Sequence, residues 1–273
     1  MRGEISLITS ALLMSTLSIF VRNINANALS ITFLRFTTAL MFISSFIFIT
    51  KQKPKVRDLS LVQLSMFNLM TVIFYIYAIQ KLEVATAALL LYMAPIYVLP
   101  LAWLSGEKVE RITWIAIPVG LLGLYLMLTP YASVNLGLIF GVLSGICYAF
   151  VFHFSKEARK KHDPFEITFF NLLFSSLVLL PYFALFPPVF SFETMKWSVG
   201  LGLVPTAVPF VLFTYGIKYV KVQKAPLFAL IEPLSASVIG FAVFGEILTQ
   251  KQIIGAILII LSISLAWRKS EES

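Results

Sequence analysis

Long apolar stretches separated by short polar links dominate the pattern of this chain. A bilayer core of about 30 Å is crossed by about 20 residues of apolar helix, and about 17 suffice at the short end. The pattern therefore predicts an all-α integral membrane protein with ten transmembrane helices. The predicted spans are Ile5–Val21, Leu29–Thr50, Leu61–Gln80, Val84–Leu104, Ile112–Leu128, Leu136–Phe154, Phe165–Phe186, Trp197–Ile217, Ala225–Phe244 and Ile253–Trp267.

Composition supports a membrane protein and argues against a water-soluble one. Hydrophobic residues make up 59% of the 273 residues and charged residues only 12%, whereas a soluble domain has about 25% charged residues. The net charge of +8 lies in short runs between the spans, so no nucleic-acid partner is expected. The single cysteine, Cys147, lies inside an apolar stretch and gives no disulfide framework.

The distribution of basic residues predicts the orientation in the membrane. With the N-terminus inside, the cytoplasmic segments carry sixteen Lys and Arg residues and the outer segments carry four. Cytoplasmic loops are enriched in Lys and Arg, so both termini are predicted to be cytoplasmic, and a multi-pass protein of the cell (plasma) membrane is expected. All four tryptophans fall at predicted helix ends, where aromatic rings favour the interface: Trp103, Trp114, Trp197 and Trp267.

The first span has a rival interpretation as a cleavable signal peptide. Arg2, an apolar stretch and the small residues of Ala26–Ala28 have the order of such a signal. The stretch is somewhat long for a signal, and the internal repeat described next requires it. A retained first helix is therefore favoured.

The two halves of the chain carry matching landmarks. Tyr77–Val84 resembles Tyr215–Val222, and both copies reach a proline eleven residues later, Pro95 and Pro233. Both then reach a Gly-Glu pair, Gly106-Glu107 and Gly245-Glu246. The chain is therefore predicted to consist of two five-helix units, residues 1–130 and 131–273.

Five helices per unit is an odd number, so the second unit is predicted to be inverted relative to the first. Inverted repeats are the architecture of many secondary transporters, with the substrate near the bilayer midplane and alternating access by rocking of one unit against the other. This pattern predicts a transporter of a small molecule.

These landmarks resemble the EamA family of the drug/metabolite transporter superfamily over essentially the whole chain. The resemblance rests on Ala87, Pro95 and Gly106-Glu107 in the first unit and on Ala225, Pro233 and Gly245-Glu246 in the second. It implies a carrier of amino acids, related metabolites or drugs, working by export or exchange without ATP hydrolysis. The second unit has Asn171 where the first has Arg35, a departure that argues against a shared role for that position.

Glu232 and Arg35 are the charged candidates for transport. Glu232 lies about seven residues into the ninth span, roughly 10 Å from its inner end, where a carboxylate is costly unless it faces a cavity or a partner. It either binds a cationic substrate group or a coupling proton, or bonds locally beside Pro233. Arg35 either attracts a substrate carboxylate or, as we favour, snorkels or bonds to another helix.

Five polar side chains complete the set of candidates for the lining of a substrate cavity. The cavity of EamA-like proteins is drawn largely from the third, fourth, sixth and eighth spans, and these residues lie on them. Aromatic side chains in an apolar helix also serve as packing residues, and this alternative stays open for each tyrosine. The five are Asn68, Tyr75, Tyr92, Tyr148 and Tyr215.

Other functional classes find less support in the sequence. No phosphate loop, His-Glu-x-x-His pair or Gly-x-Ser-x-Gly elbow occurs, so an intramembrane enzyme is disfavoured and no cofactor or metal is expected. A channel would require a selectivity filter or a ring of charged side chains around its pore, and the sequence shows neither. A non-transporting receptor or scaffold stays open as an alternative. The expected partners are a small-molecule substrate, the lipid bilayer and a coupling proton, with the chain acting as a monomer.

Overall fold

The computed structural model describes residues 2–51, 58–82, 84–128, 136–188, 191–245 and 247–268, and every regular element within these ranges is a helix. Ten membrane-crossing segments are present, which confirms the predicted count. Glu246 and the predicted unit boundary after residue 130 lie outside the described residues. The spans are α1–α2 (Arg2–Met14, Leu17–Val21), α3 (Ala28–Ile49), α4 (Leu59–Ile79), α5–α6 (Val84–Leu91, Ala94–Leu104), α7 (Arg111–Leu128), α8 (Leu136–Ala158), α9 (Pro164–Leu185), α10–η1–α11 (Phe192–Gly202, Leu203–Ala207, Val208–Ile217), α12–α13 (Ala225–Ala229, Ile231–Phe244) and α14 (Gln250–Arg268).

Several helices extend beyond the predicted spans because capping, rather than hydropathy, fixes their ends. The eighth span begins at Phe192, five residues before the predicted Trp197, because the Ser191 hydroxyl accepts a hydrogen bond from the backbone N–H of Thr194. Asp163 caps α9 in the same way and forms a reciprocal capping box with Glu166. Such caps satisfy the orphan N–H groups of the first turn without changing the apolar pattern.

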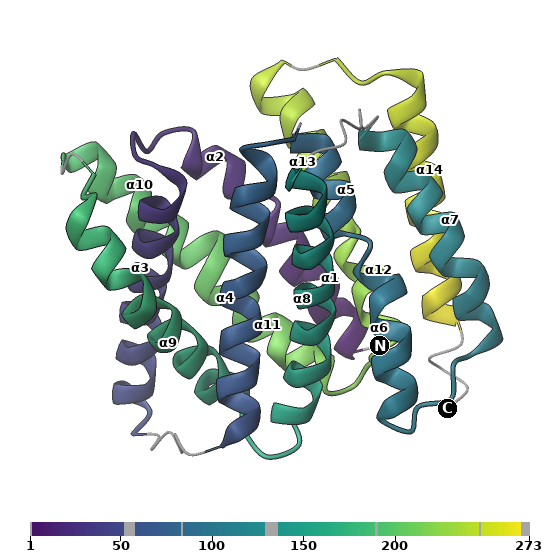
Figure 1. The fold of residues 1–273 in the computed structure, drawn as a ribbon, viewed down its shortest axis with the longest axis horizontal. Helices are drawn as coiled ribbons and strands as arrows, with labels where there is room; N and C mark the ends of the chain where they lie inside the picture. Colours follow the sequence, from purple (N-terminus) through teal and green to yellow (C-terminus); the bar gives the residue numbers. More distant parts are fainter. Residues whose placement is uncertain are drawn as a thin grey trace.

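The helices form one bundle with two distinct ends (Figure 1). We call the end where α4, α7, α9 and α12 begin the basal end, and the opposite end the apical end. The N-terminus of α1 and the C-terminus of α14 both point towards the basal end (Figure 1). The charge bias predicts that this end faces the cytoplasm.

Long-range pairs of helices hold the bundle together. The most extensive pairings are α4 with α8, α7 with α14, α3 with α9 and α1 with α11. In each pair the two helices lie more than 50 residues apart in the sequence, and every pair joins a helix of the first half to one of the second. The two halves are therefore interdigitated in one core.

Glycines allow the closest approaches between helices. A Cβ atom built on Gly255 of α14 would lie 2.4 Å from the backbone oxygen of Gly123 of α7, and one on Gly123 would lie 2.7 Å from the oxygen of Gly255. On α8, a Cβ on Gly145 would lie 2.3 Å from the oxygen of Leu90. Gly145 of α8 therefore packs against α5 within the molecule. Helices in lipid associate through such close packing, because lipid tails are as apolar as the side chains and hydrophobic burial therefore does not favour association.

Replacing Gly255 by leucine is expected to destabilise the bundle. The added side chain has no space against α7, and overpacking costs about 1–3 kcal/mol or more. A loss of that size lowers the melting temperature by about 2–4 °C per kcal/mol. Thermal unfolding of the detergent-solubilised protein measures it, with Ile254→Leu as the control because Ile254 is exposed on the same helix. Equal melting temperatures for the two variants would contradict the packing argument.

Candidate functional site

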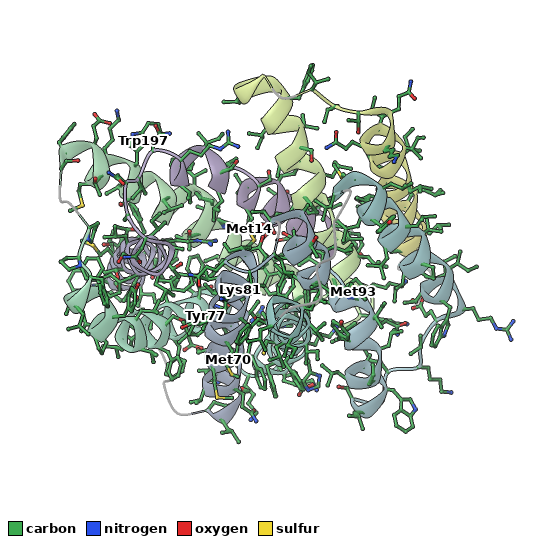
Figure 2. All side chains as sticks on the ribbon, turned by 45° about the horizontal axis from the view of Figure 1, so that its top comes forward. Met14, Met70, Tyr77, Lys81, Met93 and Trp197 are labelled. Carbon is green, nitrogen blue, oxygen red and sulfur yellow. The ribbon has the colours of Figure 1, made fainter. Side chains whose placement is uncertain are left out.

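A cavity of about 460 Å³ runs between the helices, within the usual range of about 300–1,000 Å³ for small-molecule sites. Its apical part reaches Ala26 in the loop after α2 and Ile79 at the end of α4. In Figure 2, which turns the apical end forward, Met14 of the lining lies near the middle of the bundle, and Tyr77 and Lys81 mark the apical end of α4.

The floor of the cavity lies close to the basal end. Ser155, Thr168 and Thr214 line it, and each is three or four residues from the basal end of its helix. At 1.5 Å per residue this is about 5–6 Å, or one helical turn. The cavity is thus deep, reaching the apical edge and closed at the basal end by a thin layer.

Two interrupted helices border the cavity at the matched prolines. The fourth span breaks at Tyr92 and Met93, just before Pro95, and the ninth breaks at Leu230, just before Pro233. Proline cannot donate the backbone hydrogen bond to the residue four positions earlier, so the ladder is interrupted in both spans. Gly- or Pro-interrupted spans at corresponding positions of two halves point to the binding site in secondary transporters.

Glu232 stands at the second of these breaks and faces Tyr92 from the first. Tyr92 can hydrogen-bond to the Glu232 carboxylate, and Arg35 lines the same cavity as Glu232. Tyr75 and Tyr148 line the cavity with them, and the rings of Tyr92 and Tyr148 meet edge to face with centroids 6.3 Å apart. A carboxylate, an arginine and three phenols therefore share one cavity in the membrane-spanning part of the protein.

Arg35 bonds to another helix, which was the favoured sequence interpretation along with snorkelling. Its Nε donates to Thr206 Oγ1 at 2.8 Å and its Nη2 donates to the Pro205 carbonyl oxygen at 3.1 Å. That carbonyl is available because Pro209, four residues later, has no N–H to donate. The guanidinium also lies 5.7 Å from the centroid of the Phe210 ring. Arg35 is thereby fixed beside the π-helical turn η1 while it lines the cavity.

Of the seven candidates, the structure brings six to the cavity and places one elsewhere. Tyr215 is absent from the lining and its ring instead packs 5.3 Å from that of Tyr219. Asn68 lines the cavity and its Nδ2 donates to Asn171 Oδ1 at 3.2 Å. Whether any of the six binds substrate stays a prediction.

Sequence reasoning missed a group of small polar residues in the same lining, because Ser and Thr occur throughout apolar helices without distinguishing a face. Most of their hydroxyls donate to the carbonyl four residues earlier, as Thr168 does to Pro164 at 2.8 Å. The missed residues are Thr32, Thr71, Ser155, Thr168 and Thr214.

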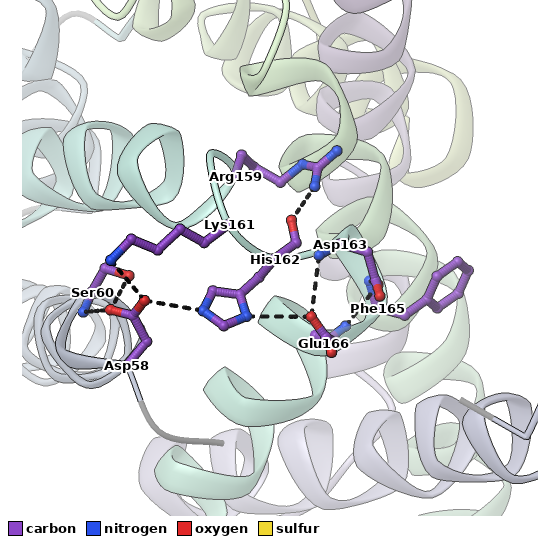
Figure 3. Close-up of polar contacts among 8 residues, drawn as sticks. All are labelled: Asp58, Ser60, Arg159, Lys161, His162, Asp163, Phe165 and Glu166. Atoms are coloured by element: carbon purple, nitrogen blue, oxygen red, sulfur yellow. Dashed lines mark hydrogen bonds and ion pairs between the residues drawn. The ribbon is translucent and has the colours of Figure 1, made fainter. Parts of the chain in front are cut away.

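The basal layer beneath the cavity is an ionic cluster that the sequence did not reveal (Figure 3). The ring of His162 lies between two carboxylates, with Nε2 3.3 Å from Asp58 Oδ2 and Nδ1 3.3 Å from Glu166 Oε2. Lys161 Nζ also lies 3.1 Å from Asp58 Oδ2, and Arg159 donates to the His162 carbonyl oxygen. We call Asp58, Arg159, Lys161, His162 and Glu166 the basal cluster. It ties the start of α4 to the start of α9.

The charge of Asp58 is strongly favoured in this arrangement. Its carboxylate accepts the backbone N–H of Ser60 at 3.0 Å as the cap of α4. That hydrogen bond first, and then the one from Lys161, hold the pKa of Asp58 well below its ordinary value of 3.8. Asp58 therefore stays ionised through the whole neutral range.

A second basal contact joins the loop before α7 to the loop before α12. Lys221 and Lys224 place their Nζ atoms 2.7 and 2.8 Å from the two oxygens of Glu110. Desolvation acts to raise the pKa of Glu110, but the hydrogen bonds and charges of the two lysines outweigh it and lower the pKa. Gln223 adds a bond to the backbone N–H of Glu110 at 2.9 Å. We call the contacts of Glu110 with Lys221 and Lys224 the Glu110 strap, and this strap and the basal cluster together the basal straps. Both link helices of the two halves at the basal end.

Comparison with known proteins assigns the chain to a family. The profile of the EamA-like transporter family matches residues 1–129 and again residues 135–268. An uncharacterized transporter of Archaeoglobus fulgidus is 54% identical over 267 residues, covering 98% of this chain and 97% of its own. A pseudopaline exporter of Pseudomonas aeruginosa is 29% identical over 110 residues, 39% of each chain.

A solved crystal structure shares the fold with a TM-score of 0.86 at 19% sequence identity, covering 98% of both chains. Ten membrane spans and these relatives make the protein a multi-pass membrane protein of a transporter family rather than of an enzyme family. The chain belongs to the EamA-like transporter family.

Proposed function

We propose that this protein is a secondary transporter that moves a small metabolite, an amino acid or a related compound, across the cell membrane by alternating access. The observation that carries the proposal is the cavity, which holds Glu232, Arg35 and three tyrosines inside the membrane-spanning bundle. An intramembrane charge pair is costly and marks a solute pathway. Opposite charges in one cavity suit a zwitterion, with an ammonium group near Glu232 and a carboxylate near Arg35.

The asymmetry of the cavity supports a carrier over a channel. The cavity reaches the apical edge, while the basal cluster and the Glu110 strap close the other end. In an alternating-access cycle the two ends open in turn around a fixed site. The cycle then requires the basal straps to break as the apical side closes, which rocking of the two halves would accomplish.

The inverted relation of the two halves belongs to the same proposal. The matched prolines interrupt one helix in each half, and the residues at these breaks, Tyr92 and Glu232, meet at the cavity. A rocking motion about such breaks would change access to the cavity without unfolding a helix. Export as the direction is suggested by the pseudopaline exporter among the relatives.

Uptake into proteoliposomes tests the function. Purified protein is reconstituted and offered pooled radiolabelled amino acids and related metabolites, with and without a pH gradient. Saturable uptake that an unlabelled solute competes away is the expected result, and a response to the gradient would identify a coupling proton. Tight binding of a solute that never crosses the membrane would instead favour a receptor.

A further inference from the structure

The deep end of the cavity contains an amide pair whose hydrogen-bonding capacity is only half used. Asn68 on α4 and Asn171 on α9 share one hydrogen bond of 3.2 Å, and neither has another partner among the described residues. Both line the cavity. Asn68 lies nine residues from the basal start of α4, and Asn171 lies seven from that of α9, about 10–14 Å from the basal end. This is the depth of Glu232.

The unused atoms of the pair form a defined pattern. A side-chain amide offers one carbonyl oxygen and one NH₂ group. One bond between two amides consumes a donor and an acceptor, so a carbonyl oxygen of one residue and an NH₂ group of the other are left. The same result holds whichever way the two amides are assigned, since swapping oxygen and nitrogen in both reverses the roles and preserves the pattern. The pair therefore leaves one donor group and one acceptor group unpaired in the lining of the cavity.

The hydroxyl groups of the same lining offer less to a ligand than the amides do. The Oγ of Ser155 has no hydrogen-bond partner, but it is buried out of reach of a water molecule. The hydroxyls of Thr168 and Thr214 are different because they already donate to backbone carbonyls, at 2.8 Å in each case. The free polar groups at the depth of Glu232 are thus those of Asn68 and Asn171.

A purely structural role explains the shared bond but not the unused atoms. Hydrogen bonds between transmembrane helices contribute about 0.6–2 kcal/mol. An amide that leaves its other atoms unpaired in the low-dielectric membrane interior loses much of that gain. The arrangement becomes favourable when something in the cavity completes the bonds.

We propose that this amide pair is a subsite for a neutral group that presents a donor and an acceptor side by side, such as a carboxamide or ureido group. Such a group would accept from the free NH₂ and donate to the free carbonyl oxygen in a two-bond contact, while Glu232 and Arg35 hold the charged end of the same solute. This inference rests on the proposed transport function. A carboxylate in its place would face the free carbonyl oxygen and Glu232, and an apolar tail would leave the amides unpaired.

The test compares three solutes of similar size that differ at the end of the side chain: glutamine, glutamate and norleucine. Each competes, as an unlabelled solute, against uptake of radiolabelled glutamine into proteoliposomes, and each is assayed for thermal stabilisation of the detergent-solubilised protein. We expect glutamine to compete and to stabilise at concentrations at least tenfold below those of the other two, because a site built for hydrogen bonds rejects analogues that lack them.

Variants assign the effect to the pair. Asn68→Leu and Asn171→Leu keep the branched shape of the side chain and remove the amide, and each is expected to weaken glutamine at least tenfold while norleucine is unchanged or improved. Asn23→Leu is the control, since Asn23 is exposed outside the cavity and bonds only to Ile19. Equal potency of glutamine and norleucine in the parent, or equal losses for both in the variants, would overturn the subsite.

The two readouts separate the subsite from the transport proposal. If glutamine stabilises the folded protein selectively but no labelled solute crosses the membrane, the subsite stands and the transport function fails. If other solutes are carried and glutamine neither competes nor stabilises, the transport function stands and the subsite is wrong.

Discussion

Glu232→Gln is expected to reduce substrate uptake about 10- to 100-fold at substrate concentrations below saturation. The substitution keeps the shape of the side chain and removes the only acidic group that the described residues contribute to the cavity lining. Hydrogen bonds to charged groups contribute about 1.5–3 kcal/mol, which corresponds to that range of affinity at about 1.4 kcal/mol per tenfold. Initial rates of uptake into proteoliposomes measure the effect.

A second assay on the same variant separates the two roles open to Glu232. If the carboxylate carries a coupling proton, exchange of internal for external substrate persists while accumulation driven by a pH gradient is lost. If it binds a cationic group of the substrate, exchange and accumulation fall together. Glu193→Gln is the matched control, because Glu193 is exposed beside Lys196 outside the cavity. Normal uptake by Glu232→Gln at every pH would remove Glu232 from the mechanism.

Asp58→Asn is expected to open the basal end of the cavity. The substitution leaves His162 with one carboxylate instead of two and takes the partner of Lys161 away. Removing one member of a partly buried, hydrogen-bonded charge cluster costs about 1–3 kcal/mol, which shifts the equilibrium between closed and open states by about 5- to 100-fold. Uptake at low substrate concentration is expected to change along with this equilibrium.

Cysteine labelling measures this opening directly. In a Cys147→Ala background, a Ser155→Cys substitution places a thiol on the floor of the cavity, and a membrane-impermeant reagent is applied to the basal side. Labelling is expected to be several-fold faster with Asp58→Asn. Glu157→Gln is the control, since Glu157 in the last turn of α8 pairs with the exposed Lys160 and such surface pairs contribute about 0–1 kcal/mol. Equal labelling rates for the two substitutions would show that the basal cluster is no gate.

The same assay has a definite pH dependence. Because the closed state lowers the pKa of Asp58 below 3.8, the stabilisation from its charge is complete above that pH and is lost as the pH falls through the lowered value. Acid lowers the reactivity of every thiol because the thiolate is the reacting form, so the expected result is that the labelling rate of the parent, divided by that of Asp58→Asn, rises as the pH falls below 3.8. Other ionisable groups also face this site: Glu166, Asp163, Lys161, Arg159 and His162 itself. The prediction therefore concerns the difference in labelling rate between the parent and Asp58→Asn at each pH, and not the pH dependence of either protein alone.

The sequence alone determined the class of the protein and the number of its membrane spans. Span length and hydropathy are local properties that a bilayer imposes on any helix, so ten spans could be counted without knowing how they pack. Pro95 and Pro233 were also readable as paired landmarks, because a missing backbone donor interrupts a helix wherever it lies. Glu232 stood out for the related reason that a carboxylate within a span needs a partner or a cavity.

Only the tertiary structure decided which side of each helix faces the cavity. In a span that is apolar all round, hydropathy does not distinguish a face towards lipid from one towards a neighbour, so Tyr215 was grouped with Tyr148 although it packs on Tyr219 instead. Packing also decided the partner of Arg35 on η1 and the pairing of Asn68 with Asn171. The basal cluster joins residues 104 positions apart in the chain, and no local pattern records a contact made by two loops that meet only when the helices are in place.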